Sequence, residues 1–142
     1  MSGFLLDTNV PSELERPRPS PNVHAFIRHT ALNALFLSDV VVAEIRFGIE
    51  TAASSERRDR LATWLKDTIR PMFAGRILPV SEDIFLRWRW IVEMTRRKGY
   101  TFDQSDALVA ATAVHHNLIV LTRDIKPFEQ AEVAYLNPWL PQ

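Results

Sequence analysis

Short apolar runs alternate with longer segments of mixed polarity along this chain. An apolar run of strand length that ends at polar or turn-forming residues is typical of a buried strand. Such runs predict strands at residues 4–6, 35–37, 77–80 and 118–121. The last run, from Leu118 to Leu121, is apolar without interruption, as in a strand that is covered on both faces.

Apolar residues at three- and four-residue spacing predict helices between these strands. The predicted helices cover residues 22–29, 39–53, 55–69, 82–98 and 103–116, and a shorter helix opens near Pro11. Polar residues that can cap a helix stand at the starts of these segments, namely Asn22, Ser38 or Asp39, Ser54 or Ser55, Ser81 and Asp103. Gly99 and Asn117 are placed to end the last two helices. Three prolines make residues 16–21 an irregular loop.

This alternation of strands and helices predicts an α/β fold. Strands that are joined through helices form a parallel or mostly parallel sheet with helices packed on it. In such folds, binding sites lie beyond the carboxyl ends of the strands. A chain of 142 residues has the length of one typical domain, so we expect residues 1–142 to form a single domain.

Composition narrows the chemistry that the chain can support. The sequence has no cysteine, which excludes disulfides and thiolate zinc sites, so any metal ligand must be an oxygen or an imidazole. The apolar N-terminal run meets Asp7 after three residues and lacks a basic start, so we expect neither a signal peptide nor a membrane span, and a cytoplasmic location. The formal net charge is zero, so any contact with a polyanion must be local.

Two acidic residues follow predicted strands. Asp7 comes directly after the strand at residues 4–6, and Asp124 follows the strand at residues 118–121 by way of Thr122 and Arg123. Parallel pairing of these strands would bring both acids to the same edge of the sheet. Either acid alone is also a common turn residue or helix cap, so the argument depends on convergence.

Two more acids lie at the borders of apolar helix stripes. Glu44 is three residues after Val41 and four before Gly48, where an acid is either a metal ligand or a member of a salt bridge. Asp106 stands in the first turn of its helix, where the helix dipole favours a carboxylate. Small alanine side chains along that helix would let it approach the sheet closely. Asp103 is expected to cap this helix and remains a reserve ligand.

Several carboxylates brought close together repel one another once water is excluded, and a hard cation relieves that repulsion. A set of ligands that are all oxygens favours Mg2+ or Mn2+. Such an ion polarises a phosphoryl oxygen and lowers the pKa of a bound water. The pattern of Asp7, Glu44, Asp106 and Asp124 therefore predicts a metal-dependent hydrolase that acts on phosphodiester bonds.

The same residues resemble a known family, the PIN-domain ribonucleases of the VapC and FitB type, which are toxins of bacterial type II toxin-antitoxin systems. The resemblance covers nearly the whole chain and is carried by residues 4–9 (FLLDTN), 38–48 (SDVVVAEIRFG), 106–113 (DALVAATA) and 121–124 (LTRD). It implies a three-layer α/β/α fold, Mg2+- or Mn2+-dependent endoribonuclease activity on an RNA substrate, a homodimer, and a small cognate antitoxin as partner.

The resemblance also implies roles for particular residues. Asp7, Glu44 and Asp106 match the core metal ligands of the family, and Asp124 matches its more variable fourth acid. Polar residues beside these acids match positions whose hydroxyls or amides would orient the carboxylates or the attacking water. These polar residues are Thr8, Asn9 and Thr122.

Two other functions stay open at this point. One is a PIN-like binding module without catalysis that acts in an antitoxin complex. The other is an aspartyl-phosphate phosphotransferase, although Asn9 stands where that class carries a second aspartate. The cations from Arg87 to Lys98 predict either an RNA-binding face or a solvated face balanced by acids, and Trp90 is expected to point away from the core.

Overall fold

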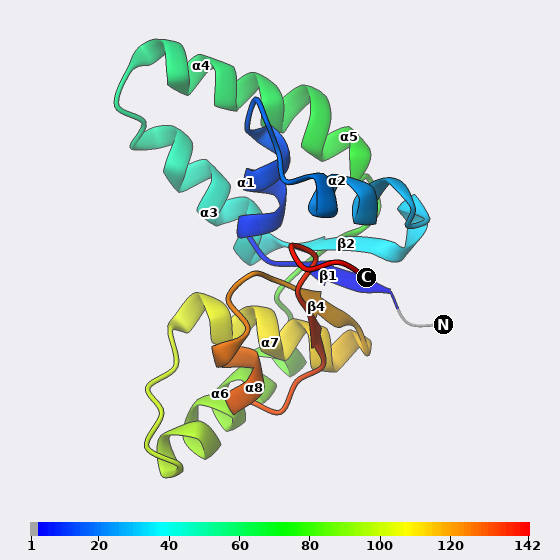
Figure 1. Cartoon of the computed structure of the whole chain (residues 1–142). Helices are drawn as coiled ribbons and strands as arrows, with labels where there is room; N and C mark the ends of the chain where they lie inside the picture. Colours follow the sequence, from blue (N-terminus) through cyan, green and yellow to red (C-terminus); the bar gives the residue numbers. More distant parts are fainter. Residues whose placement is uncertain (1–2) are drawn as a thin grey trace.

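The computed structural model describes residues 3–142 and contains a parallel β-sheet between two layers of helices (Figure 1). Within these residues the sheet has five strands in the order β3-β2-β1-β4-β5, and every neighbouring pair is parallel. The strands are β1 (Phe4–Leu6), β2 (Leu35–Ser38), β3 (Ile77–Leu78), β4 (Ile119–Leu121) and β5 (Tyr135–Leu136). Met1 and Ser2, part of the N-terminal segment discussed above, lie outside the described residues.

The helices lie on both faces of the sheet, which confirms the predicted three-layer α/β/α fold. In Figure 1, α1 to α5 lie above the sheet, whereas α6, α7 and α8 lie below it. Their bounds are α1 (Asn9–Glu15), α2 (Pro21–Arg28), α3 (Asp39–Glu50), α4 (Ser55–Trp64), α5 (Arg70–Met72), α6 (Glu82–Arg97), α7 (Gln104–His116) and α8 (Lys126–Gln130). A 3-10 turn, η1 (Leu32–Ala34), precedes β2, and a π-helical segment, η2 (Leu65–Ile69), joins α4 to α5.

The central strand β1 sets the register of the sheet. Phe4 pairs with Leu35 of β2 on one side, and Leu6 pairs with Leu121 of β4 on the other. One residue further on, the Asp7 amide donates a hydrogen bond of 2.9 Å to the Leu121 carbonyl. The strands therefore end together, and the segments that follow β1 and β4 leave the sheet side by side.

Most predicted helix ends are confirmed by their capping bonds. The side chains of Ser38, Ser54, Ser81 and Asp103 each accept a hydrogen bond from the first turn of α3, α4, α6 and α7, respectively. Asn117 ends α7 with a φ of 55°, a left-handed conformation that asparagine tolerates better than most residues. Local polar chemistry thus fixes where these helices begin and end.

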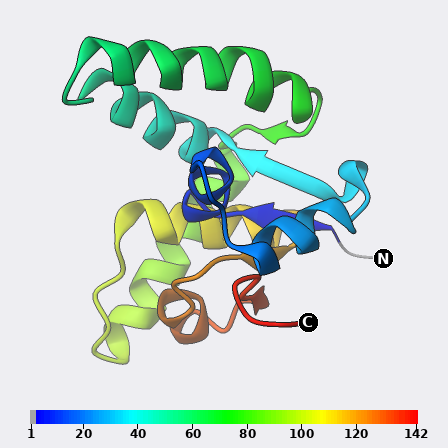
Figure 2. The same cartoon turned by 45° about the horizontal axis from the view of Figure 1, so that its top comes forward.

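Some predicted boundaries were wrong. Ser20, not Asn22, caps α2, because Pro21 has the fixed φ and the missing N–H that suit the first helical position. Helix α3 ends at Glu50 instead of residue 53, since the Thr51 hydroxyl and the Ala52 amide bond to carbonyls of the last turn. The chain then reverses into α4, and α3 and α4 form a helical hairpin at the top of Figure 2.

Helix α7 packs closely on the sheet because its inner face is built from small side chains. Ala107, Ala110, Ala111 and Ala113 are all completely buried. Their burial is what the alanine pattern predicts for a helix packed on both α6 and the sheet, and the close approach to the strand ends stays a prediction. No helix in residues 3–142 is long and apolar enough to cross a membrane.

Candidate active site

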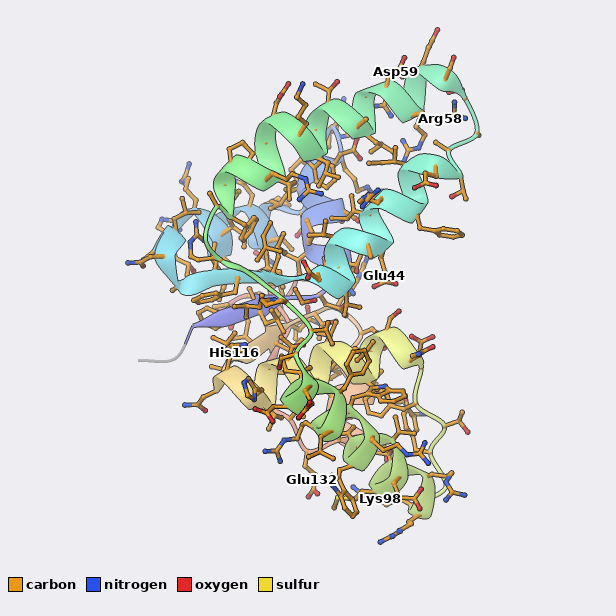
Figure 3. The ribbon with its side chains drawn as sticks, turned by 180° about the vertical axis from the view of Figure 1, so that it is seen from behind. Glu44, Arg58, Asp59, Lys98, His116 and Glu132 are labelled. Atoms are coloured by element: carbon orange, nitrogen blue, oxygen red, sulfur yellow. The ribbon has the colours of Figure 1, made fainter. Side chains whose placement is uncertain are left out.

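Four acidic side chains meet beyond the carboxyl ends of β1 and β4. Asp7 follows β1 and Asp124 follows β4, while Glu44 comes from α3 and Asp106 from the first turn of α7, which packs against α3. Each of the other three acids raises the pKa of Asp106 by its charge, and Glu44 and Asp124 do the same to Asp7. Figure 3 shows Glu44 on the part of α3 nearest the sheet. The convergence expected from the sequence is therefore present.

Asp7 is the buried acid of the group, with 6% of its surface exposed. Its Oδ1 accepts a hydrogen bond of 2.9 Å from the Thr8 amide, and its Oδ2 accepts one of 2.9 Å from the Thr122 hydroxyl. Burial raises the pKa of the Asp7 carboxyl, and the charges of Glu44 and Asp124 add to this rise, while the two hydrogen bonds oppose it. The carboxylate is thus held in one orientation at an energetic cost.

Thr122 is the centre of the hydrogen-bond network around Asp7. Its fully buried hydroxyl accepts from the Asp124 amide at 3.0 Å and from the Asn9 side-chain amide at 3.3 Å. A hydroxyl has a single proton to donate, and the Asp7 oxygen at 2.9 Å is a better acceptor than the Asp124 carbonyl at 3.4 Å. Thr122 therefore connects the segments that follow β1 and β4.

Glu44 differs from Asp7 because it is exposed to solvent. Its Oε1 accepts a hydrogen bond of 2.8 Å from the hydroxyl of Thr8, the residue directly after Asp7. The Thr8 amide therefore donates to Asp7 and the Thr8 hydroxyl donates to Glu44, which links the start of α1 to α3. The other carboxylate oxygen of Glu44 has no hydrogen-bond partner among the described residues.

Asp106 has the most strongly shifted pKa described for the site. Partial burial raises its pKa to about 7, and the charges of Asp7, Asp103, Asp124 and Glu44 contribute in that order. Asp103 itself caps α7, since its Oδ1 accepts from the amides of Ser105 at 3.0 Å and Asp106 at 3.3 Å. Asp103 therefore has the capping role that its position predicts, and it also adds negative charge next to Asp106.

The acids share one charged region without forming a ready-made chelate. Within residues 3–142, no three acidic or histidine side chains are arranged so that they could already hold an ion. Asp7 is fixed by its hydrogen bonds, whereas Glu44 is exposed and only singly bonded, so closing around an ion requires rotation of the outer acids. The set of donors, all of them carboxylate oxygens, fits a hard divalent cation.

Two features of the site were not predicted from the sequence. One is Tyr100, where burial and then the charges of Asp106, Asp124 and Asp103 raise the pKa of the phenol hydroxyl. The other is Arg123, whose guanidinium lies over the Trp139 ring at 5.3 Å. The backbone amide of Arg123 donates a hydrogen bond of 3.3 Å to Asn9 Oδ1. Arg123 lies within the LTRD motif, so its position gave a signal, but nothing in the sequence connects it to Trp139.

The basic residues at the end of α6 are largely paired with acids. Arg96 and Arg97 lie 2.7 Å and 3.9 Å from Glu93 carboxylate oxygens, and Lys98 lies 3.7 Å from Glu132, as Figure 3 shows for the last pair. These contacts favour the solvated, balanced face over the RNA-binding face. Trp90 is 54% exposed, which confirms that it points away from the core.

The chain is a three-layer α/β/α domain with four acids beyond the carboxyl edge of its sheet, and comparison with known proteins identifies the family. The sequence model described as "PIN domain" matches residues 4–134, so the chain belongs to the PIN-domain family. Within that family, the chain is of the VapC and FitB type. This membership argues against the aspartyl-phosphate phosphotransferase.

Curated relatives cover almost the entire chain. Toxin FitB from Neisseria gonorrhoeae is 39% identical over 96% of this chain and 98% of its own length. VapC ribonuclease Y4jK from Sinorhizobium fredii is 37% identical over 97% of this chain and 99% of its own length. Two relatives from Rickettsia that are 24% and 23% identical are also named VapC ribonucleases.

Solved structures show the same architecture. The crystal structure of FitAcB from Neisseria gonorrhoeae has a TM-score of 0.90 and 39% identity, and it covers 96% of this chain and 98% of that chain. The structure of FitAB bound to an IR36 DNA fragment has a TM-score of 0.91 and 37% identity, with 98% and 97% of the two chains covered. The backbone of the present protein thus follows these structures over nearly its whole length.

Proposed function

We propose that this protein is a Mg2+- or Mn2+-dependent endoribonuclease and the toxin of a type II toxin-antitoxin pair. The observation that carries the proposal is the convergence of Asp7, Glu44, Asp106 and Asp124, which come from four separate segments, on one edge of the sheet. Such an arrangement costs stability in the absence of a cation, so a purely structural role does not account for it. The names of its relatives, toxins and ribonucleases, support the choice of substrate.

In this proposal the four carboxylates hold the metal, and two of them, Asp7 and Glu44, are positioned by hydrogen bonds from neighbouring residues. The Thr8 amide and the Thr122 hydroxyl fix Asp7, and the Thr8 hydroxyl steadies Glu44. A bound divalent cation supplies Lewis-acid polarisation of the phosphate and a bound water of lowered pKa. The Asn9 side-chain amide donates a hydrogen bond to the Thr122 hydroxyl. This bond helps Thr122 to keep Asp7 in its orientation when substrate enters.

Asp106 holds a proton in part of the molecules near neutral pH, because its pKa is about 7. Metal ligands must be deprotonated, so loading the site releases that proton and makes metal affinity rise with pH. The negative charges that raise the pKa of Asp106 are the same ones that would attract the ion. The repulsion among the carboxylates, which destabilises the metal-free protein, therefore also strengthens the binding of a cation.

The partners in this proposal follow from the relatives. Solved structures of FitAB and of VapBC complexes contain a toxin with its antitoxin. We therefore expect a small antitoxin encoded beside this protein, and a homodimer as its own assembly. A PIN-like binding module without catalysis is the alternative, and the experiment below separates the two.

The test incubates the purified protein, freed of any antitoxin, with total RNA and Mg2+ or Mn2+, with and without EDTA, and maps new RNA ends. Discrete metal-dependent cuts are expected from the parent protein and none from Asp7→Asn. Asparagine keeps an oxygen for the Thr8 amide and can donate to Thr122, so the variant should fold. Asp59→Asn, in the middle of α4 and away from Glu44 in Figure 3, is the matched control and should cut normally.

Either of two results would contradict the proposal. One is full cleavage by Asp7→Asn, and the other is cleavage that survives EDTA. If the folded parent cuts no RNA and Mn2+ does not raise its melting temperature, the binding module is the better description.

A further inference from the structure

A groove between α1, α3 and α4 opens directly beside the acidic site. Its volume is about 420 Å³, and its lining includes Thr8 and Glu44, which both belong to the acidic cluster. A polymer whose scissile bond lies at the acids must continue along the surface on either side of that bond. Glu44 also lines another hollow, so this groove is one candidate path for the chain of the substrate.

The groove is lined by both charged and apolar side chains. Two arginines, Arg16 and Arg57, and two acids, Glu15 and Glu44, are among them. Arg16 lies 3.3 Å from Glu13 and Glu15 lies 3.6 Å from Arg60, whereas Arg57 forms no salt bridge with any residue of the described chain. Ile49 and Trp64 are among the apolar lining residues. An unpaired cation beside an aromatic, apolar surface is the usual arrangement for single-stranded nucleic acid.

The second hollow that reaches Glu44 has a different character. It lies between α3 and α7, has a volume of about 550 Å³, and is lined by Asp39 together with apolar residues such as Phe47 and Leu108. No arginine or lysine is among the described residues that line it. An anionic strand is therefore favoured in the groove that carries Arg57 and disfavoured in the one that carries Asp39.

We propose that the groove between α1, α3 and α4 is the subsite for the nucleotide of a single-stranded RNA next to the scissile phosphodiester. Arg57 contacts the backbone phosphate of this nucleotide, and the base rests on the apolar lining beside Trp64. The inference rests on the proposed ribonuclease function and adds to it the path and the strandedness of the substrate.

Gly48 offers a way to block the groove without disturbing the helix. It lines the groove from the last turn of α3, and a Cβ placed on it would meet nothing within 4 Å. Replacing a helical glycine by alanine usually stabilises a protein. Gly48→Leu should therefore fold well and fill the groove, and Gly48→Ala is the control that adds only a methyl group.

The experiment measures the binding of a short fluorescein-labelled single-stranded RNA by anisotropy at several salt concentrations. The full chain carries Asp7→Asn throughout, so that the probe is not cut. Arg57→Ala should weaken binding about three- to tenfold and reduce the slope of log affinity against log salt by about 0.7. Arg58→Ala, the neighbouring arginine outside the groove, should change neither quantity.

Gly48→Leu should weaken binding about tenfold or more, and Gly48→Ala should bind like the parent.

A second readout separates this proposal from the one on which it rests. In proteins that retain Asp7, Arg57→Ala and Gly48→Leu should keep the parent's stabilisation by Mn2+, because neither change touches the acids. Parental RNA affinity and salt slope in Arg57→Ala, or parental affinity in Gly48→Leu, would overturn the subsite while leaving the nuclease in place. Normal RNA cleavage by Gly48→Leu combined with escape from an inhibitory protein would assign the groove to that protein instead. Absence of RNA binding and cutting by the parent would overturn both proposals.

Discussion

At the scale of single residues, the hydroxyl of Thr122 has more partners than any other group near the acids. It donates to Asp7 and accepts from the Asp124 amide and the Asn9 side chain, and it is fully buried. A buried donor or acceptor that loses its partner costs about 1 to 3 kcal/mol. One hydroxyl therefore supports both the stability of the sheet edge and the orientation of Asp7.

The first prediction is that Thr122→Val lowers the free energy of unfolding by about 1 to 3 kcal/mol. Valine has nearly the same shape but leaves Asp7 Oδ2 without its donor and the Asp124 amide without its acceptor. RNA cleavage should fall as well, because Asp7 loses its fixed orientation. Urea unfolding and cleavage rates check both effects. Thr122→Ser keeps the hydroxyl and should lie close to the parent, so equal losses in both variants would argue against the network.

Asp106 gives a prediction about pH. Its pKa is about 7 in the folded protein against an ordinary value of 3.8, so between about pH 4 and 7 the folded state binds a proton that the unfolded chain has released. Stability from this group is thus lost as the pH rises through that range. In EDTA, the free energy of unfolding of Asp106→Asn relative to the parent should increase from pH 4 to pH 7.5. A constant difference across this range would contradict the shifted pKa.

At the scale of secondary structure, helix α7 shows how packing positions the site. Its alanines are completely buried where the helix packs on α6, α3 and β4, and Asp106 stands in its first turn. Interiors are close-packed, so a larger side chain on this face must displace either the helix or the sheet. The distance between α7 and the strands is therefore a determinant of the geometry of the acids.

Ala110→Leu tests this relation. Overpacking of a filled core costs about 1 to 3 kcal/mol, so we expect a loss of stability in this range together with reduced cleavage per folded molecule. Val114→Leu, on the exposed side of the same helix, is the matched control and should change neither quantity appreciably. Urea unfolding with cleavage assays on the folded fraction measures both. A variant with normal stability and activity would show that α7 does not need small residues.

Many element boundaries were predictable because they depend on neighbours in the sequence. Helix α6 begins after Ser81 and ends before Gly99, and α7 begins after Asp103 and ends at Asn117. The hydrogen bonds that cap these helices join residues only a few positions apart. The short elements after Asp124 were not predicted. Helix α8 is five residues long and β5 is two, so neither gives a periodic pattern, and β5 exists through its pairing with β4.

The same distinction applies to the site. Asp7 and Asp124 could be placed together from sequence, because parallel strands bring their carboxyl ends to one edge. The contact of Arg123 with Trp139 and the approach of Tyr100 to the acids could not, because they depend on how the C-terminal segment and the chain after α6 fold back. The roles of the four acids as metal ligands stay predictions that the experiments above test.

At the scale of the whole molecule, α6 presents an apolar stripe that the fold leaves uncovered. Leu86, Trp90 and Met94 are spaced four residues apart and are 60%, 54% and 53% exposed. Contiguous exposed apolar surface of this kind marks interaction sites. The helix also begins with Glu82 and Asp83 and ends with arginines, so its charge is opposite at its two ends.

This pattern is self-complementary. If α6 packs antiparallel to α6 of a second copy, the two apolar stripes cover each other, and each acidic start faces a basic end. A two-fold axis between the helices makes the same patch serve both subunits, as in the commonest kind of homodimer. The homodimer expected from the resemblance to the VapC and FitB type therefore has a physical basis in this surface.

The last prediction is that Trp90→Glu shifts the protein from dimer to monomer. The substitution places a charge at the centre of the stripe and opposite its own copy, where burial and like-charge repulsion both oppose association. Sedimentation velocity over a range of protein concentrations measures the change, and the parent should sediment as a dimer.

Leu32→Glu, an exposed apolar position before β2, is the control and should leave the dimer intact. Because Trp90 is exposed in the single chain, the monomer should keep its melting cooperativity. A Trp90→Glu protein that remains dimeric would place the interface on another face.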